Sequence, residues 1–370
     1  MRYLKHVKHI FYKRKVLPLA MTFFVTNKCN ARCKHCFYWK ELSKNKKILI
    51  LEEIEKISKT MDDLILLILT GGEPFLRRDL PKIAEVFYKN NHVKNIVIPT
   101  NGLLTNTIVN YTEQIVKNCK KTHLTVYISL DDIDEKHDSF RGVKGIFKRA
   151  ISTYKKLSKL KQKYSNLSVG ILLTVNPLNQ TRVLKIYNSI KKRLNPNFIS
   201  PILMRSTSKV LNSKNVDIKH YDQLKNTIKK DILNKELSGH TNFSLSSFAT
   251  TLNLIKHEII SKTVKEGYQI PCYAGLISAT LYEDGSLFPC EMLNQKIGNL
   301  RDFNYDFRKI WFNEKTNRIR DYIKNSKCYC TYECAVDTNI LFNPKILLTM
   351  FKEWELMRLT WLFKFKVKKR

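Results

Sequence analysis

Six short apolar segments that alternate with amphipathic segments constrain the fold of this 370-residue chain more than any other feature. The apolar segments lie at residues 20–27, 64–74, 95–102, 124–132, 168–177 and 198–206. The helical segments between them lie at residues 50–61, 79–91, 106–119, 146–164 and 181–194. Buried strands that alternate with helices predict an α/β fold with a parallel sheet, and six repeats predict a partial (β/α)6 barrel of the TIM type. Chemistry in such barrels gathers at the carboxyl ends of the strands, where the polar motifs of this chain lie.

The pattern changes after a lysine-rich helical stretch at residues 217–266. From Tyr268 to Asn339 the chain carries cysteines and a hairpin-like DGSLFPCE turn, which predict a smaller domain whose core is partly inorganic. The tail from Pro344 is rich in Leu, Phe and Trp and ends in KFKVKKR. We therefore predict a barrel at 18–240, an auxiliary region at 268–340 and a basic amphipathic tail at 341–370.

The charge of the chain is unusual, because 66 Lys and Arg face 32 Asp and Glu for a net charge of +34. One interpretation is a polyanionic partner, such as nucleic acid, an anionic membrane or an acidic substrate. The other is a lysine-rich composition that covers the whole surface. The basic residues are spread from end to end without a dense arginine cluster, which favours the second interpretation and makes a nucleic-acid partner the less favoured one.

The chain is expected to be cytoplasmic. Its start lacks the apolar region of a signal peptide, and no stretch of 18 apolar residues predicts a transmembrane helix. Tightly grouped cysteines in such a protein indicate metal ligands rather than disulfides. The tail leaves two alternatives open: it lies on a membrane surface as a peripheral contact, or it packs on the barrel.

Three cysteines follow the first predicted strand directly, as Cys29, Cys33 and Cys36. Each thiolate of such a triplet can bind a different iron of a cubane cluster, which leaves the fourth iron open for a substrate or cofactor. A structural zinc site would need four ligands, and His35 is a poor fourth because adjacent ligands on one loop rarely share a metal. Three unrelated buried cysteines are the remaining alternative.

The triplet after the first strand of a partial barrel resembles the signature of the radical S-adenosylmethionine (SAM) superfamily. The resemblance implies that SAM chelates the open iron of a [4Fe-4S] cluster, and that the reduced cluster cleaves SAM to a 5′-deoxyadenosyl radical. That radical would abstract a hydrogen atom from a substrate. A GGEP element ends the second strand as in the family, which implies that Gly71, Gly72 and Glu73 bind the amino group of SAM.

Polar residues at the ends of later strands would complete the SAM site. The string DEKHDSFRGVKGIF at 134–147 resembles one in family members with C-terminal cluster domains, and it implies that Arg141 binds the carboxylate of SAM. A surface salt bridge is the alternative for Arg141, and plain core packing is the alternative for Met204. The predicted SAM-binding residues are Gly71, Gly72, Glu73, Asn101, Ser129, Asp131, Arg141, Thr174, Asn176 and Met204, of which the last three would line the ribose and adenine.

The second cysteine group consists of Cys272, Cys290, Cys328, Cys330 and Cys334. The spacing of the first two around Gly285 resembles SPASM and twitch domains, which carry auxiliary iron–sulfur clusters. A full SPASM domain has more cysteines, and five cannot fully ligate two clusters. We therefore predict one auxiliary [4Fe-4S] cluster on Cys272, Cys290 and two of the other three, with a spare thiol that is inert or donates a hydrogen atom. A structural zinc is the alternative, and the isolated Cys119 is predicted to be a buried apolar residue.

The sequence therefore predicts a radical SAM oxidoreductase or maturase whose auxiliary cluster assists electron transfer. Its partners would be a reductant such as flavodoxin or ferredoxin and a peptide or small-molecule substrate, which the sequence does not name. An RNA-modifying radical SAM enzyme is one alternative, although no dedicated RNA-binding appendage is evident. A non-catalytic iron–sulfur electron carrier is the other, although a carrier needs neither an open iron nor a cofactor cradle.

Overall fold

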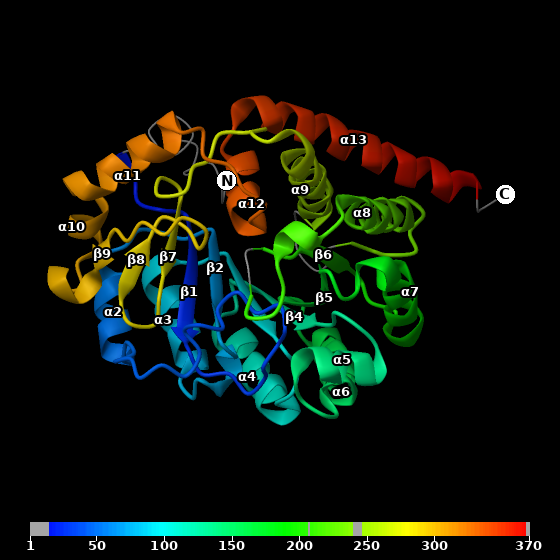
Figure 1. Ribbon diagram of the computed structural model, residues 1–370, viewed down its shortest axis with the longest axis horizontal. Coiled ribbons are helices and arrows are strands. Elements are labelled where there is room, and N and C mark those ends of the chain that lie inside the picture. Colours follow the sequence, from blue (N-terminus) through cyan, green and yellow to red (C-terminus); the bar gives the residue numbers. More distant parts are fainter. Residues whose placement is uncertain (1–14, 206–207, 240–245, 368–370) are drawn as a thin grey trace.

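The computed structural model describes residues 15–205, 208–239 and 246–367. Six parallel strands form its centre, at β1 (Ala20–Thr26), β2 (Leu66–Gly71), β3 (Asn95–Thr100), β4 (His123–Ser129), β5 (Leu167–Val175) and β6 (Ile199–Leu203). The helices between and after them are α2 (Leu51–Lys59), α3 (Leu80–Asn91), α4 (Thr105–Asn118), α5 (Asp134–Arg141), α6 (Ile146–Lys163), α7 (Val183–Leu194) and α8 (Ile218–Leu233). Each predicted strand is therefore present, and the strand–helix alternation is confirmed (Figure 1).

The sheet is longer than the predicted barrel. Its strand order is β6-β5-β4-β3-β2-β1-β7-β8-β9, so that β6 and β9 are its two edges within the described residues. The added strands are β7 (Ser278–Leu281), β8 (Ser286–Phe288) and β9 (Gly298–Asn299). Because β7 pairs in parallel with β1, the second half of the chain extends the barrel sheet. The partial barrel is confirmed, and the domain boundaries stay a prediction.

The core follows from the periodicity of each element. Every residue of β1 is buried, as expected for a strand that has another strand on each side and covers on both faces. On α6, Ile146, Ala150, Tyr154 and Leu157 recur at helical spacing and are buried against the sheet. The outer faces of these helices carry the lysines, so the basic surface and the apolar core arise from one repeating pattern.

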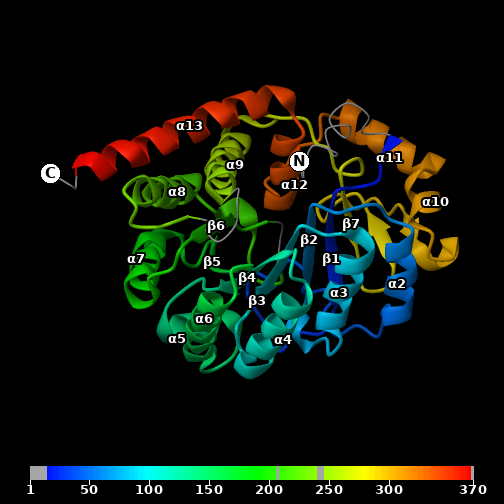
Figure 2. The ribbon, with the colours of Figure 1, turned by 180° about the vertical axis from the view of Figure 1, so that it is seen from behind.

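The remaining helices cover one end of the sheet. They are α9 (Ser246–Glu266), α10 (Phe307–Trp311), α11 (Glu314–Asn325), α12 (Glu333–Leu341) and α13 (Pro344–Val367), and short 3₁₀ helices lie at Pro74–Leu76, Gln180–Arg182, Ser213–Asn215 and Leu300–Phe303. Figures 1 and 2 show α13 crossing α8, α9 and α12 at the edge of the molecule.

The described part of the tail packs on other helices. Met350 and Met357 on α13 are buried, and the Trp354 indole donates to Ser247 Oγ of α9 at 2.9 Å. These contacts support packing of the tail, whereas its basic end at residues 362–370 lies outside the described side chains, and membrane contact stays a prediction. No helix among the described residues has the length and apolarity needed to cross a bilayer.

Candidate active site

The loop that carries the cysteine triplet begins where β1 ends and is held by the end of α5. The backbone N–H of Arg32 donates to Arg141 O at 2.9 Å, and that of Lys34 donates to Phe140 O at 3.0 Å. The imidazole of His35 stacks on the ring of Phe140 with centroids 4.8 Å apart. Because these contacts lie between the cysteines, α5 fixes the course of the loop between Cys29 and Cys36.

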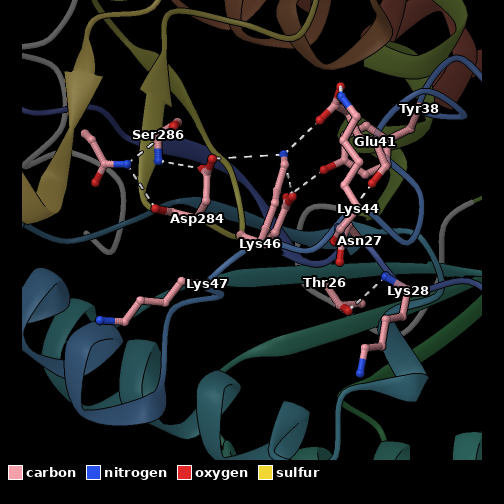
Figure 3. A network of polar contacts seen from close by, with 12 residues as sticks. Thr26, Asn27, Lys28, Tyr38, Glu41, Lys44, Lys46, Lys47, Asp284 and Ser286 are labelled. Atoms are coloured by element: carbon pink, nitrogen blue, oxygen red, sulfur yellow. Dashed lines mark hydrogen bonds and ion pairs between the residues drawn. The ribbon is translucent and has the colours of Figure 1, made fainter.

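A polar network ties the segment after the triplet to the turn between β7 and β8 (Figure 3). The hydroxyl of Tyr38 donates to Glu283 Oε2 at 2.6 Å. The ammonium of Lys46 lies 2.9 Å from Glu283 Oε1 and 2.9 Å from Glu41 Oε2. The side chain of Asn27 donates to the backbone oxygens of Glu41 and Lys44, which closes the loop on itself. The triplet loop is therefore anchored to the auxiliary region as well as to the barrel.

The three thiols lie close enough to act on one another electrostatically. Burial raises the pKa of Cys29 to about 11 and the pKa of Cys36 to about 12, and neighbouring sulfurs add to both shifts. Burial also raises the pKa of Cys33, which the guanidinium of Arg141 opposes from 3.6 Å. Deprotonating all three thiols therefore costs free energy. Binding of a metal centre can offset this cost, because the metal binds the thiolate form.

The two glycines of the GGEP element let β2 touch the triplet loop. Gly71 has φ +137°, and a Cβ there would lie 2.1 Å from Thr26 O. A Cβ on Gly72 would lie 2.2 Å from Lys28 O and 3.1 Å from Cys29 Cβ. Any side chain at either position would push the loop away, so the glycines are required by the close approach of two backbones.

Glu73 joins the ends of β2 and β3 through its buried carboxylate. The carboxylate accepts hydrogen bonds from Thr100 Oγ1 and from the backbone N–H of Asn101, both at 2.8 Å. The side chain of Asn101 donates in turn to Asn30 Oδ1 on the triplet loop at 2.8 Å. Burial raises the pKa of Glu73 to about 7, against these hydrogen bonds, which lower it. A cation that binds beside a carboxylate with a raised pKa stabilises the charged form of that carboxylate. The site therefore favours a ligand that carries an ammonium group.

Asp131 and Arg141 form a buried ion pair beside the triplet. The guanidinium Nη2 of Arg141 donates to Asp131 Oδ2, and the backbone N–H of Thr174 donates to Asp131 Oδ1 at 3.0 Å. Burial alone would raise the pKa of Asp131, but the charge of Arg141 brings it down to about 2. Arg141 is 6% exposed, so the alternative of a surface salt bridge is wrong.

Unsatisfied polar atoms surround this ion pair. Among the described residues, Arg141 Nε, His35 Nδ1 and His137 Nε2 are buried without a hydrogen-bond partner. Buried polar groups are normally paired, so three unpaired polar atoms around this ion pair indicate a polar ligand. The donors suit the carboxylate that the resemblance assigns to SAM, and the residues present therefore fit the implied cofactor.

The structure brings six predicted SAM-binding residues around the triplet, namely Gly71, Gly72, Glu73, Asn101, Asp131 and Arg141. Thr174 contacts Asp131 through its backbone, and Ser129 ends β4 beside them. The side chain of Asn176 donates to Thr174 O and accepts from Leu178 N, so it shapes its own turn. Met204 is buried with Phe140 and Leu211, which supports the core alternative for this residue. Whether these residues bind SAM stays a prediction.

The second cysteine group gathers around β7 and β8. The thiol of Cys272 donates a hydrogen bond to the sulfur of Cys328, which raises the pKa of Cys272 and lowers that of Cys328. Cys330 experiences the charges of Cys290 and Cys328. The strongest charges on Cys334 are instead those of Glu291 and Arg205. Cys328 and Cys330 thus interact with both Cys272 and Cys290, whereas the main charges acting on Cys334 come from groups outside the cysteine group. Cys119 is 1% exposed, as predicted.

No three His, Cys, Asp or Glu side chains of the described residues meet at the spacing of a single metal ion. A [4Fe-4S] cluster takes each cysteine on a separate iron, so its ligands need not meet at one point. The sequence interpretation also missed a buried group of Arg205, Glu291, Tyr332 and Glu333 between the two cysteine groups. The available signal was adjacency, because Glu291 follows Cys290 and Glu333 precedes Cys334.

Residues 23–188 match the family model of the Radical SAM superfamily. This segment of the chain is a radical SAM domain. The expected resemblance to this superfamily is thereby confirmed, and the cofactors of the superfamily are a [4Fe-4S] cluster and SAM. An AdoMet-dependent heme synthase from Methanosarcina barkeri is 26% identical over 336 residues, which is 86% of this chain and 90% of that protein.

Other curated proteins match over a smaller share of their length. The sporulation killing factor maturation protein SkfB of Bacillus subtilis is 30% identical over 45% of this chain and 38% of its own length. An Fe-coproporphyrin III synthase of Methanosarcina barkeri is 27% identical over 51% of this chain and 45% of its own length. This chain thus spans less than half of these two curated relatives.

Two solved structures share the fold over most of this chain. One is anSMEcpe with bound AdoMet, with TM-score 0.58 and 19% identity over 94% of this chain and 98% of that chain. The other is SuiB of Streptococcus suis bound to precursor peptide SuiA, with TM-score 0.59 and 16% identity over 86% of this chain and 71% of that chain. Both likenesses extend beyond the barrel into the auxiliary region.

Proposed function

We propose that this protein is a radical SAM enzyme that cleaves SAM reductively and abstracts a hydrogen atom from its substrate. The observation that carries the proposal is the convergence of the cysteine triplet, Glu73 and the Asp131–Arg141 pair at the ends of neighbouring strands. When bound, the [4Fe-4S] cluster and SAM supply the 5′-deoxyadenosyl radical. A flavodoxin or ferredoxin supplies the electron.

The residues of the chain bind and orient the cofactor. Gly71 and Gly72 let the end of β2 approach β1 and the triplet loop closely, which places Glu73 beside the triplet, and the Glu73 carboxylate accepts from the amino group of SAM. Arg141 donates to its carboxylate while Asp131 holds the guanidinium in place, a charge-assisted arrangement that fixes both distance and direction. Burial of this ion pair keeps water away from the bound cofactor and strengthens each of these interactions.

We further propose that Cys272, Cys290, Cys328 and Cys330 bind one auxiliary [4Fe-4S] cluster. The interactions of Cys328 and Cys330 with Cys272 and Cys290 support this ligand set, in which Cys334 is the spare thiol. In this assignment the spare thiol is inert or donates a hydrogen atom. When bound there, the cluster would supply an acceptor for the electron that the substrate loses after hydrogen abstraction.

A peptide or protein is the first candidate substrate. Its support is the similarity to SkfB, a maturation protein, and to SuiB bound to a precursor peptide. A tetrapyrrole is the second candidate, because the match to the AdoMet-dependent heme synthase covers 90% of that protein. The net charge of +34 also favours a substrate that carries carboxylates, as porphyrins with propionate groups do.

Anaerobic incubation of the reconstituted protein with SAM and dithionite tests the reaction. We expect 5′-deoxyadenosine, together with about eight irons and eight sulfides per chain for two [4Fe-4S] clusters. If 5′-deoxyadenosine does not form, the proposed reaction is wrong. About four irons per chain would remove the auxiliary cluster and leave the reaction standing.

Three cysteine variants separate the two groups. Cys33→Ala should abolish 5′-deoxyadenosine formation, whereas Cys290→Ala should keep some cleavage that is uncoupled from substrate oxidation. Cys119→Ala is the matched control, because Cys119 is buried away from both groups and its loss should affect stability alone. Equal cleavage by the Cys33→Ala and Cys119→Ala proteins would contradict the assigned ligands.

A further inference from the structure

Arg205 lies between the two cysteine groups, two residues after the end of β6. Its guanidinium carbon is 5.3 Å from the ring centre of Phe37 on one side and 4.5 Å from that of Tyr332 on the other. Its side chain is 16% exposed. A cation held between two aromatic rings in a largely buried site interacts strongly with nearby charges, because little water screens it.

Two carboxylates face this guanidinium without satisfying it. Arg205 Nη1 lies 3.6 Å from Glu291 Oε2 and 3.7 Å from Glu333 Oε2, which is beyond hydrogen-bond distance. Neither Arg205 Nη1 nor Glu291 Oε2 has a hydrogen-bond partner among the described residues, and both atoms are buried. These charges are therefore held near one another by the surrounding structure rather than by a bidentate pair.

All four neighbours of the guanidinium lie within two residues of a predicted cluster cysteine or of the spare thiol. Phe37 follows Cys36, Glu291 follows Cys290, and both Tyr332 and Glu333 lie between Cys330 and Cys334. Charge from Arg205 also reaches Cys330 and Cys334. Arg205 therefore acts on the second cysteine group through its charge, whereas Arg141 also contacts Cys33 of the triplet directly.

The neighbours of Arg205 are fixed in their turn. The hydroxyl of Tyr332 donates to Glu291 Oε1 at 2.5 Å and is hydrogen-bonded to Thr22 Oγ1 of β1 at 3.0 Å. The backbone N–H of Leu203 donates to Glu333 Oε1 at 3.3 Å. These residues are therefore hydrogen-bonded to β1 and β6, the first and last strands of the barrel, and the fold sets their geometry.

We propose that Arg205 is a positioning residue that raises the reduction potential of the auxiliary cluster, with Glu291 acting in the opposite direction. The inference rests on the auxiliary cluster of the proposed function. Reduction adds one negative charge, which a buried cation stabilises and a buried carboxylate destabilises. The many surface lysines contribute little by comparison, because water and salt screen them.

Charge substitutions at the two residues should therefore shift the potential with opposite signs. Arg205→Gln removes the cation and leaves two carboxylates unopposed, so the potential should fall. Glu291→Gln removes a negative charge at nearly constant volume, so the potential should rise. Arg205→Lys keeps the charge and should restore most of the wild-type potential. A merely structural role for Arg205 predicts no such ordering.

The test is a redox titration followed by electron paramagnetic resonance on the reconstituted full-length chain. Cys29, Cys33 and Cys36 are replaced by alanine in every sample, so that the signal comes from the auxiliary cluster alone. We expect Arg205→Gln to lower the ratio of reduced to oxidised cluster at a fixed potential about tenfold, which is about 59 mV for one electron. Arg193→Gln is the matched control, because Arg193 pairs with Asp134 at the surface and should leave the potential unchanged.

An unchanged potential in the Arg205→Gln protein, or shifts of the same sign in the Arg205→Gln and Glu291→Gln proteins, would overturn the inference. If Arg205→Gln does not fold, the Glu291→Gln and Arg205→Lys proteins still decide, since a rise in the first and little change in the second are required. Absence of the auxiliary signal from the triplet-free chain would overturn both the auxiliary cluster and the role of Arg205. Failure of the wild-type chain to form 5′-deoxyadenosine would instead refute the proposed reaction and leave the ordering of potentials intact.

Discussion

The missing side chain at Gly72 decides how closely β2 can approach the triplet loop. Its backbone conformation does not demand glycine, but a Cβ would lie 2.2 Å from Lys28 O, which is far inside van der Waals contact. The loop would have to move away from Glu73, because the Glu73 N–H donates to the same Lys28 oxygen at 2.8 Å. A single methyl group at position 72 would therefore move the cysteine triplet away from the Glu73 carboxylate.

Gly72→Ala should therefore lower 5′-deoxyadenosine formation at least tenfold, since small misplacements of reacting groups cost that much or more. The control is Gly145→Ala, where a Cβ meets no atom within 4 Å and only the left-handed conformation at φ +80° is strained, for about 1 kcal/mol. Iron content and cleavage are measured for both proteins. Near-wild-type cleavage by the Gly72→Ala protein would show that the loop can yield.

A buried histidine far from the cysteines should report on acid stability. Burial lowers the pKa of His123 to about 4, and the charge of Lys161 adds to this effect. The unfolded chain binds a proton at this site below about pH 6.5, before the folded chain does, so the free energy of unfolding falls as the pH falls from 6.5 to 4. His123→Gln should remove about 3 kcal/mol of this loss. Urea unfolding at several pH values measures it, and parallel curves for the two proteins would contradict the assignment.

At the scale of elements, the barrel strands were predictable from the sequence, but the pairing of the barrel with the auxiliary region was not. The six barrel strands are near-continuous apolar runs, which few other structures require. Helix α5 escaped prediction because its residues are mostly polar, and it is positioned by contacts to the triplet loop. The pairing of β7 with β1 joins short segments more than 250 residues apart, and no local pattern encodes that distance.

The same reasoning applies to the site. Residues in recognisable motifs, such as Glu73 and Arg141, were predicted because their spacing is local. Arg205 meets Phe37 and Tyr332 only through the folded chain, so its single position in the sequence carries no signal. Prediction from sequence therefore reached the motifs and missed the charges between them.

The β7–β1 pairing should be essential for folding of the barrel. A chain that ends at Glu266 lacks β7 and leaves β1, an entirely buried and mostly apolar strand, as an unpaired edge. Such edges pair with other molecules, so this shortened chain should aggregate, as measured by sedimentation. A soluble monomer with the wild-type helix content would contradict the expectation and would make the barrel an independent unit.

At the scale of the whole molecule, α13 should add stability without forming part of the candidate site. A chain that ends at Asn343 loses the burial of Met350 and Met357, worth roughly 3–6 kcal/mol together. For a protein of this size the melting temperature should then fall by about 4–8 °C. The rate of 5′-deoxyadenosine formation should stay near the wild-type rate, and its loss would place the tail at the active site.

The position of β7 beside β1 also has a consequence for biosynthesis. The first strand leaves the ribosome early, but one of its two neighbours is made about 200 residues after the other, which takes on the order of 10–40 s at typical elongation rates. During that interval β1 is paired with only one of its two neighbouring strands. Glu283, which accepts a hydrogen bond from Tyr38 after the cysteine triplet, has not yet been synthesised. Iron delivered during translation would encounter a cysteine triplet whose loop is not yet fixed by the later part of the chain. Cluster assembly in the cell should therefore follow release of the complete chain.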